Sequence, residues 1–313
     1  MICWPRLIPR RPMSIPNKLI VRRSHIVPRF YLRGFCESLT DRLWVGDIRL
    51  QKCFCANITN VAVEKDFYAS EAGIHEDDLE HRLSKIESEA APKLKEFTLS
   101  VADISPELGR FIAWLAARIT WLRRATDEQF PAFVLANQQS LQKLVGVSET
   151  CPFEFEHAIS GKRERISLAA ALERINDKGW RSRVTQDQHL DVIRLQAHLF
   201  RSEHFPRMRW VRASAPYGHR FVTSDRPVSW DIMGAGVGDY PAALRDPLAE
   251  LIVPITADFA LVAGHDRSAI LARTWQVDEI NQRTAAAAER FIYGSTEQDV
   301  SALLRLRSRD RLQ

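Results

Sequence analysis

The chain has 313 residues, of which 45% are hydrophobic, and its formal net charge is +5. This length is sufficient for a sizeable core in one or two domains. The longest apolar runs, FIAWLAA and TAAAA, are far shorter than the ~20 residues of a transmembrane helix, so a membrane-spanning protein is excluded. The modest positive charge is compatible with nucleic acid or another anionic partner without requiring one.

The predicted elements begin after an N-terminal arm. Residues 1–22 are interrupted by prolines and lack the continuous apolar segment of a secretory signal. They are expected to be a disordered arm, or upstream sequence translated from a start assigned too early, with Met13 as the alternative start. A basic arm that touches nucleic acid is the other interpretation.

A short helix and short strands are predicted next. Pro28 suits the first turn of a helix that ends near Gly34, with Ser24 or His25 just before it. The segments 42–50 and 53–68 are rich in β-branched and aromatic residues, which is typical of antiparallel strands.

Helical patterns dominate the middle of the chain. Apolar residues at spacings of three and four predict a helix over 77–97, which Pro92 should kink or break near Ala91. Ser105 and Pro106 form the N-terminal signal of the next helix. Further helical patterns cover residues 127–145, 167–178 and 187–203.

The period of the apolar residues changes near Arg207. Segments 207–214 and 220–230 predict a hairpin whose second strand stops at Asp225, and segments 249–255 and 257–265 predict a second strand pair. Helices are expected over 276–292 and 298–307, and linkers over 146–166 and 231–248.

These elements predict an α+β protein. Strands at both ends of the chain surround a mostly helical middle region, which is typical of an antiparallel sheet packed by helices. We expect a single globular domain over residues 23–313.

The five cysteines are odd in number and have no framework spacing. Cys53 and Cys55 would lie on one face of a strand, but a zinc site would need two further ligands at suitable spacing. Reduced cysteines in the cytoplasm are therefore expected.

Six segments of the chain resemble a known family in their order and composition. They are SHIVPRFYLRGF, NVAVEKDFY, LEHRLSKIESEAAP, FVTSDRPV, PITADFALV and INQRTAAAAERFIYGS. Over roughly residues 23–294 the chain is similar to the bacterial family catalogued as domain of unknown function 4238. The resemblance implies kinship without an activity. Members often have two adjacent histidines where this chain has Ser24 and His25, so it does not imply a histidine-pair metal site.

His25 is the first candidate site residue. It stands just before the predicted helix N-terminus, where the backbone N–H groups and the helix dipole disfavour a charged imidazolium. A neutral histidine that accepts a proton or binds a metal is one interpretation. A capping or core histidine bonded to the backbone is the other.

Two carboxylates flank the apolar stripe of the helix over 77–97. Glu80 and Glu87 lie two turns apart along one edge of this helix, where carboxylates can line a cleft. Salt bridges with neighbours such as Arg82 or Lys85 are the alternative. Glu87 is the stronger candidate.

Arg118 is expected inside the apolar face of the helix that starts at Pro106. A buried guanidinium must be paired with an anion, because an unpaired buried charge is costly. The expected partner is Glu87, Asp225 or an anionic group of a ligand.

Asp225 is the fourth candidate. It is expected where a strand stops, a position at which an aspartate can act as a metal ligand or base. The alternative is an Asx-turn, in which the carboxylate bonds the backbone two residues further on.

Basic residues cluster over 201–220. Arg207 and Arg209 are expected on one strand face, with Met208 and Trp210 on the other. Such a strand could follow a nucleic-acid backbone, or it could be an ordinary amphipathic strand with a solvated face.

Two functions remain open. The chain lacks G-x-G-x-x-G, Walker A, G-x-S-x-G and H-E-x-x-H motifs, which argues against the enzyme classes that they define. In the first hypothesis the protein is a hydrolase-like enzyme acting on a phosphate ester such as nucleic acid, with or without a divalent metal as cofactor. Its catalytic residues would be His25 as ligand or proton carrier, Glu87 and Asp225 as ligands or bases, and Arg118 as electrostatic clamp. In the second it is a non-enzymatic binding module in which these residues form a structural network.

Overall fold

The computed structural model of the protein describes most of the chain. The described residues are 23–37, 40–65, 67–68, 79–96, 104–120, 153–167, 170, 173–174, 177, 179–183, 186–232, 246–265 and 276–310. The expected arm over 1–22 and the helical pattern over 127–145 lie outside these residues.

The chain divides into two compact units. The main unit comprises Arg22–Tyr68, Glu76–Leu122 and Asp191–Gln313, and the small unit comprises Met1–Val21, Ala69–His75 and Arg123–Leu190. The division falls inside helix α7 (Gln186–Leu199). The expectation of a single domain over 23–313 stays a prediction.

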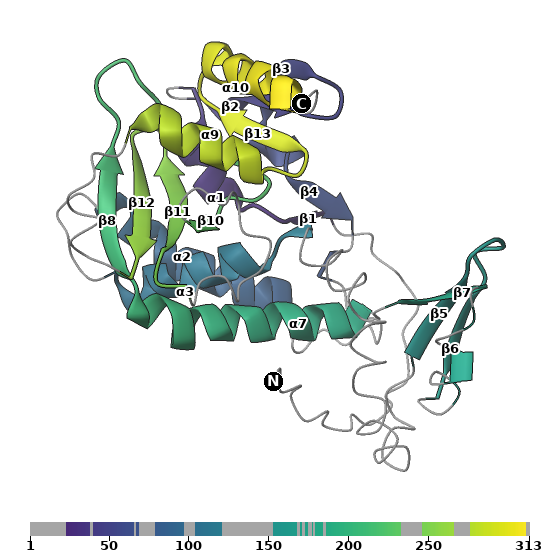
Figure 1. Ribbon diagram of the computed structural model, residues 1–313. Coiled ribbons are helices and arrows are strands. Elements are labelled where there is room, and N and C mark those ends of the chain that lie inside the picture. Colours follow the sequence, from purple (N-terminus) through teal and green to yellow (C-terminus); the bar gives the residue numbers. More distant parts are fainter. Residues whose placement is uncertain are drawn as a thin grey trace. The chain divides into compact units, whose positions relative to one another are not determined.

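One four-stranded antiparallel sheet of the main unit is built mainly from the second half of the chain (Figure 1). Its order is β10 (Ser229–Ile232), β11 (Ala249–Thr256), β12 (Phe259–Gly264) and β8 (Arg209–Ser214). Every residue of β11 except the last is buried, so the strand reads as a continuous apolar run broken only by Glu250.

A second four-stranded antiparallel sheet combines strands from both ends of the chain. Its order is β3 (Lys52–Asn57), β2 (Arg42–Asp47), β13 (Phe291–Gly294) and β9 (Thr223–Ser224). A two-stranded ladder, β1 (Arg23–His25) with β4 (Val63–Lys65), holds the start of the described chain.

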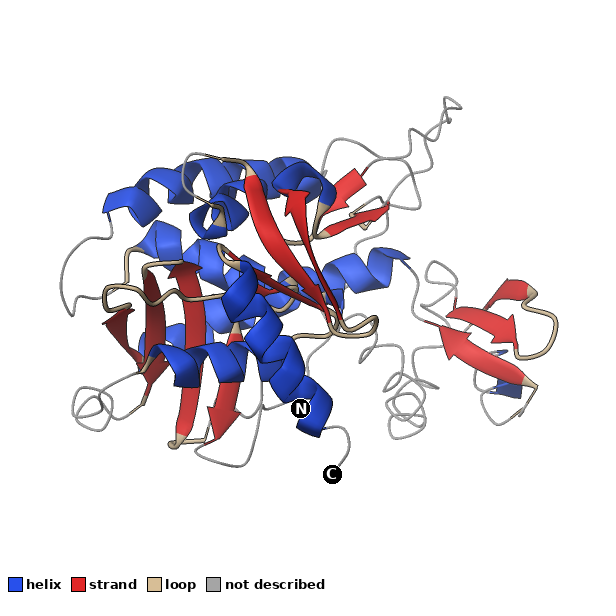
Figure 2. Ribbon diagram, turned by 90° about the horizontal axis from the view of Figure 1, so that it is seen from above, coloured by secondary structure: helices blue, strands red, loops and turns tan. Residues whose placement is uncertain are grey.

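The main unit also contains helices, drawn in blue in Figure 2. They are α1 (Arg29–Leu32), α2 (Leu79–Glu96), α3 (Pro106–Ala117), α9 (Val277–Ala287) and α10 (Glu297–Asp310). Short turns of helix are η1 (Arg33–Phe35), η2 (Ile58–Asn60), the π-helical η5 (Phe200–His204) and η6 (Phe205–Arg207). No helix in the described segments has the length and hydropathy of a membrane span.

Helix α10 packs closely on the second sheet. A Cβ atom added to Gly46 of β2 would lie 2.8 Å from Val300 Cγ1, and one added to Gly294 of β13 would lie 2.9 Å from Val300 Cγ2. The helix can therefore approach these strands only because both positions lack a side chain.

The small unit contains a three-stranded antiparallel sheet. Its order is β6 (Arg163–Ile166), β5 (Phe153–His157) and β7 (Trp180–Arg183). Two of these strands fall in the stretch 146–166 that was expected to be a linker, so that expectation was wrong. The alternation of Glu and Phe along β5 is the period-2 signal that could have identified it.

The α+β class is confirmed, but several connections differ from those expected. The described chain has four sheets where one was predicted. The prediction of a hairpin over 207–230 was wrong, because β8 pairs with β12 while β9 pairs with β13 in another sheet. The helix expected over 276–292 ends at Ala287, and the chain enters β13 four residues later.

One helix also differs from its prediction, and another agrees with it. Helix α2 continues through Pro92 to Glu96, so the expected break is not found. Pro92 has no N–H group, and the carbonyl of Ser88 therefore lacks its usual donor within the helix. The N-terminus of α3 is as predicted, since Ser105 accepts a hydrogen bond from the Leu108 amide at 3.2 Å.

We expect Gly46→Ala to destabilise the protein by about 1–3 kcal/mol, because the added methyl group has no space beside Val300. The matched control is Gly109→Ala within α3, where the nearest atom to the new methyl group is 3.7 Å away. This control should stabilise the protein by about 0.5–1 kcal/mol, since alanine favours a helix over glycine. Chemical denaturation of both variants measures the difference, and equal effects would contradict the close packing of α10.

Candidate functional site

A pocket of about 520 Å³ lies in the main unit, where β1, α1, α2 and the C-terminal end of α3 meet. Its volume is in the range of small-molecule sites. Three of the predicted site residues, His25, Glu87 and Arg118, line it. The fourth, Asp225, is not among its lining residues.

His25 is positioned by backbone pairing at the end of β1, opposite Val63 of β4. Its imidazole forms a hydrogen bond with the backbone of Ile58. The Nε2 atom is shielded from solvent and has no hydrogen-bond partner among the described residues, so the bond to Ile58 is made by Nδ1. This arrangement selects the tautomer that leaves a lone pair on Nε2.

The pKa of His25 is lowered, first by desolvation and then by the positive charge of Arg29. The lowered pKa favours the neutral imidazole of the first interpretation, although the cause is different, and the bond to the Ile58 backbone is a feature of the second. Pro28 is the N-cap of α1, and this helix has only four residues, so burial replaces the expected helix-terminus effect.

Arg118 provides a buried positive charge in the pocket wall. Its side chain is 1% exposed, and its Nη1 atom donates to Glu87 Oε1 at 2.7 Å. The expectation that Arg118 pairs with a carboxylate is thus confirmed, with Glu87 as the partner. Burial opposes the charge, but the neighbouring Tyr68 and Glu87 raise the pKa of Arg118 above its usual range.

Arg118 was expected inside the helix, and this was wrong. It forms the C-cap of α3, with ψ at 55°. The turn out of the helix places its side chain beside α2. The Nε and Nη2 atoms of this guanidinium are buried and have no hydrogen-bond partner among the described residues. Unpaired buried donors are costly, so this guanidinium retains capacity for an acceptor.

One face of α2 supplies a wall of the pocket. The lining residues are Leu83, Ser84, Glu87, Ser88 and Ala91, whose spacings of three and four place them on one side of a helix. Glu80 also lies on α2, but its side chain is outside the described part of the structure.

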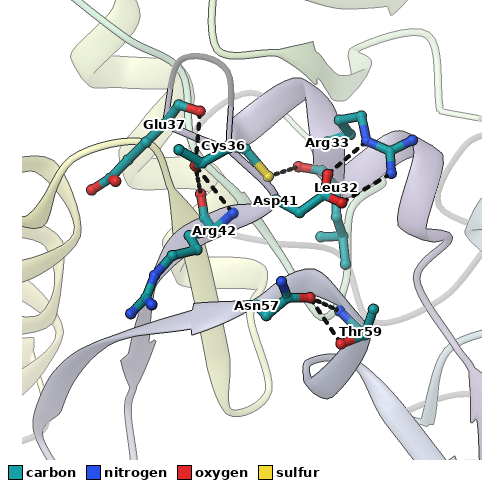
Figure 3. Close-up of polar contacts among 9 residues, drawn as sticks. Leu32, Arg33, Cys36, Glu37, Asp41, Arg42, Asn57 and Thr59 are labelled. Carbon is teal, nitrogen blue, oxygen red and sulfur yellow. Dashed lines mark hydrogen bonds and ion pairs between the residues drawn. The ribbon is translucent and has the colours of Figure 1, made fainter.

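Helix α1 contributes Arg29 and Phe30 to the pocket lining, and the following turn η1 contributes Arg33. Figure 3 shows how its C-terminal end is held: Arg33 Nε donates to Asp41 at 2.9 Å, and the Cys36 thiol bonds the Leu32 carbonyl. Arg33 is therefore already paired at the surface, while the exposed Arg29 is close enough to influence His25.

Sequence reasoning missed Tyr68, Ser84, Arg29 and Arg33 as lining residues. Tyr68 is buried, and its hydroxyl donates to the His25 carbonyl at 3.4 Å. Ser84 could have been found, since it precedes Glu87 by three residues on the same helix face. The approach of Tyr68 to His25 depends on the β1–β4 pairing, for which the sequence has no local signal.

Asp225 serves a different part of the fold. Its carboxylate accepts hydrogen bonds from the backbone N–H groups of Glu289, Arg290 and Phe291 at 2.9, 2.8 and 3.0 Å. Burial raises its pKa to about 6, against the effect of these three donors. It thus holds the loop between α9 and β13, and it does not form the Asx-turn that was the alternative interpretation.

The structure also bears on the predicted metal ligands, cysteines and basic strand. In the described segments, no three side chains of histidine, cysteine, aspartate and glutamate are grouped so that they could hold a metal ion. Cys36, Cys53 and Cys55 are not in disulfides. Arg207 and Arg209 are exposed while Met208 and Trp210 are buried, as predicted, but Arg207 belongs to η6 and β8 begins only at Arg209.

The fold and the pocket define an α+β protein in which a neutral histidine and a buried arginine share one cavity. A family model described as "Protein of unknown function (DUF4238)" matches residues 23–298, and the chain belongs to this family. The resemblance seen in the sequence is therefore confirmed. No curated protein and no solved structure matches the chain.

We expect strong energetic coupling between Arg118 and Glu87. In a double-mutant cycle with Arg118→Met and Glu87→Gln, the coupling should be about 1.5–3 kcal/mol, because one partner is fully buried. The control cycle uses Arg110 and Glu89, which join the same two helices at 2.9 Å but are each about one-third exposed. Its coupling should be below about 1 kcal/mol. Coupling below ~0.5 kcal/mol for the first pair would mean that Arg118 and Glu87 do not interact directly.

Asp225→Ala should destabilise the protein by at least ~3 kcal/mol, because three backbone N–H groups lose their acceptor. Asp258→Ala is the control, since this aspartate is mostly exposed and forms an ion pair with a surface arginine, Arg220. Its effect should be within about 0.5 kcal/mol. Thermal or denaturant unfolding measures both, and a stable Asp225→Ala variant would overturn the structural role.

Proposed function

We propose that the protein is an enzyme that hydrolyses a phosphate ester in this pocket. The observation that carries the proposal is the meeting of two complementary groups in one cavity. Arg118 has buried donors without a partner among the described residues, and His25 has an unpartnered Nε2. The first group suits an anion, and the second suits the proton of an attacking water molecule.

Phosphate fits the cationic side of the pocket. A guanidinium presents several N–H donors in a planar fork that matches phosphate oxygens. Arg118 would hold the phosphoryl group inside the cavity, and Arg29 would add a second positive charge at its exposed side. The buried position of Arg118 strengthens its attraction for an anion, because the local dielectric constant is low.

The proposed step is a displacement at phosphorus by water. The water oxygen forms a bond to phosphorus while its proton passes to Nε2 of His25, and the bond from phosphorus to the ester oxygen breaks. The departing oxygen takes a proton from a solvent water, and the imidazolium returns its own proton to solvent afterwards, so a phosphomonoester gives inorganic phosphate and an alcohol. Arg118 stabilises the negative charge on the phosphoryl oxygens throughout the step.

Glu87 has two roles in this proposal. It keeps Arg118 in place through their ion pair at 2.7 Å, and its negative charge favours the protonated form of His25. The carboxylate thus stabilises the imidazolium that the step creates. Glu87 is a positioning residue here, since its carboxylate acts through Arg118 and His25.

Nucleic acid stays within the proposed class of phosphate esters, although the burial of Trp210 removes one surface on which bases could stack. The reduced thiols of Cys36, Cys53 and Cys55 support a cytoplasmic location. Asp225 is omitted from the reaction because its carboxylate is occupied by backbone donors.

A screen of purified protein against phosphomonoesters, phosphodiesters and single-stranded DNA should detect hydrolysis, measured as release of phosphate or of the alcohol. His25→Gln and Arg118→Lys should each reduce kcat/KM by about 100-fold or more, because each removes a group that acts on the reacting atoms. The controls are His219→Gln and Arg209→Lys, which change exposed residues that do not line the pocket. Binding of phosphate esters without any turnover would contradict the enzyme and favour the non-enzymatic binding module.

The pH profile offers an independent check. Neutral His25 is required, and its pKa lies below the usual 6.5. We therefore expect kcat/KM to be full at pH 7 and to fall only as the pH decreases through this lowered pKa. Arg29→Gln removes a charge that lowers the pKa, so the decline should begin at a higher pH. An unchanged profile in Arg29→Gln, alongside an unchanged Arg209→Gln control, would remove His25 from the reaction.

A further inference from the structure

We infer that the substrate is a phosphomonoester that carries an aromatic ring, and that this ring packs against Phe30. The inference rests on the proposed function and adds the chemical class of the group that leaves. It follows from the apolar part of the pocket, which the hydrolytic step does not use.

The Phe30 ring lies in the pocket lining and is supported from the core. It is partly buried, lines the pocket, and contacts Phe111 with a centroid distance of 5.1 Å and an interplanar angle of 52°. Phe111 is fully buried, so it fixes the Phe30 ring from the side of the core. A ring held in this way loses little freedom when a ligand packs on its remaining surface.

The neighbouring side chains suit a ring that is bonded to a phosphate. Pro28 precedes Phe30 by two residues, and Leu83 and Ala91 contribute apolar surface from α2. Arg29, adjacent to Phe30 in sequence, is an exposed cation of the pocket lining and suits the charge of a phosphomonoester, which is a dianion at neutral pH. The pocket thus combines an apolar wall with cationic groups within one cavity.

The size of the pocket favours a small ester over a nucleic-acid strand. A volume of about 520 Å³ accommodates one ring and one phosphate. Strands of nucleic acid are bound along grooves in which several aromatic side chains stack successive bases. Two aromatic side chains, Phe30 and Tyr68, line this pocket, and Tyr68 is buried with its hydroxyl bonded to the His25 carbonyl. Phe30 is therefore the ring that we assign to the substrate.

The test compares benzyl phosphate with cyclohexylmethyl phosphate. The two esters have similar size and similar leaving groups, but only the first has an aromatic ring. The full-length protein should hydrolyse benzyl phosphate with a kcat/KM about tenfold higher, as expected for one aromatic contact. Phe30→Leu retains apolar volume and should bring this ratio close to one, while Phe30→Tyr should preserve it.

Phe54→Leu is the matched control, because Phe54 is an exposed aromatic residue on β3 that does not line the pocket. It should leave the ratio unchanged. Equal hydrolysis of both esters by the wild type, or an unchanged ratio in Phe30→Leu, would overturn the aromatic substrate while leaving the hydrolase intact. Faster cleavage of a single-stranded oligonucleotide than of benzyl phosphate would also overturn it. Failure to cleave any phosphate ester would reject the proposed function itself.

Discussion

The hydroxyl group of Tyr31 connects the parts of the main unit on which the pocket depends. It donates to the carbonyl of Pro254 in β11 and lies 2.9 Å from Thr223 Oγ1 in β9, so a single side chain of α1 is bonded to both four-stranded sheets. Burial raises the pKa of Tyr31 far above its usual range, and the hydroxyl therefore keeps its proton. Because α1 is held on this side by the sheets, its other residues are fixed beside the cavity.

The buried guanidinium of Arg118 has a different relation to stability. An ion pair with Glu87 compensates part of the cost of burying the charge, but two of its nitrogen atoms remain without a partner among the described residues. A side chain selected only for stability would be expected to satisfy these donors or to be apolar, since a well-packed apolar residue is often as stable as a buried pair. Retaining an incompletely paired charge in a cavity wall is typical of a site whose remaining partner is a ligand.

The sequence predicted local features well and long-range ones poorly. The N-cap at Ser105, the helical spacing around Glu87 and the alternation around Met208 are each determined by neighbours in sequence, and each is found. The burial of Arg118 and its pairing could be predicted because the cost of an isolated charge limits the options. The role of Asp225 could not, since its three donors lie more than sixty residues away and are backbone atoms without a sequence signature. The same holds for β13, which is a strand only because β2 and β9 flank it.

The contact of α10 with the second sheet links the identities of three distant residues. Gly46 and Gly294 belong to adjacent antiparallel strands, and the same side chain, that of Val300, faces both of them. These three positions thus share one volume, so a methyl group can be added at one of them only if it is removed at another. Across related chains with this fold, positions 46, 294 and 300 should therefore vary together, with alanine in a strand accompanied by a smaller residue on the helix.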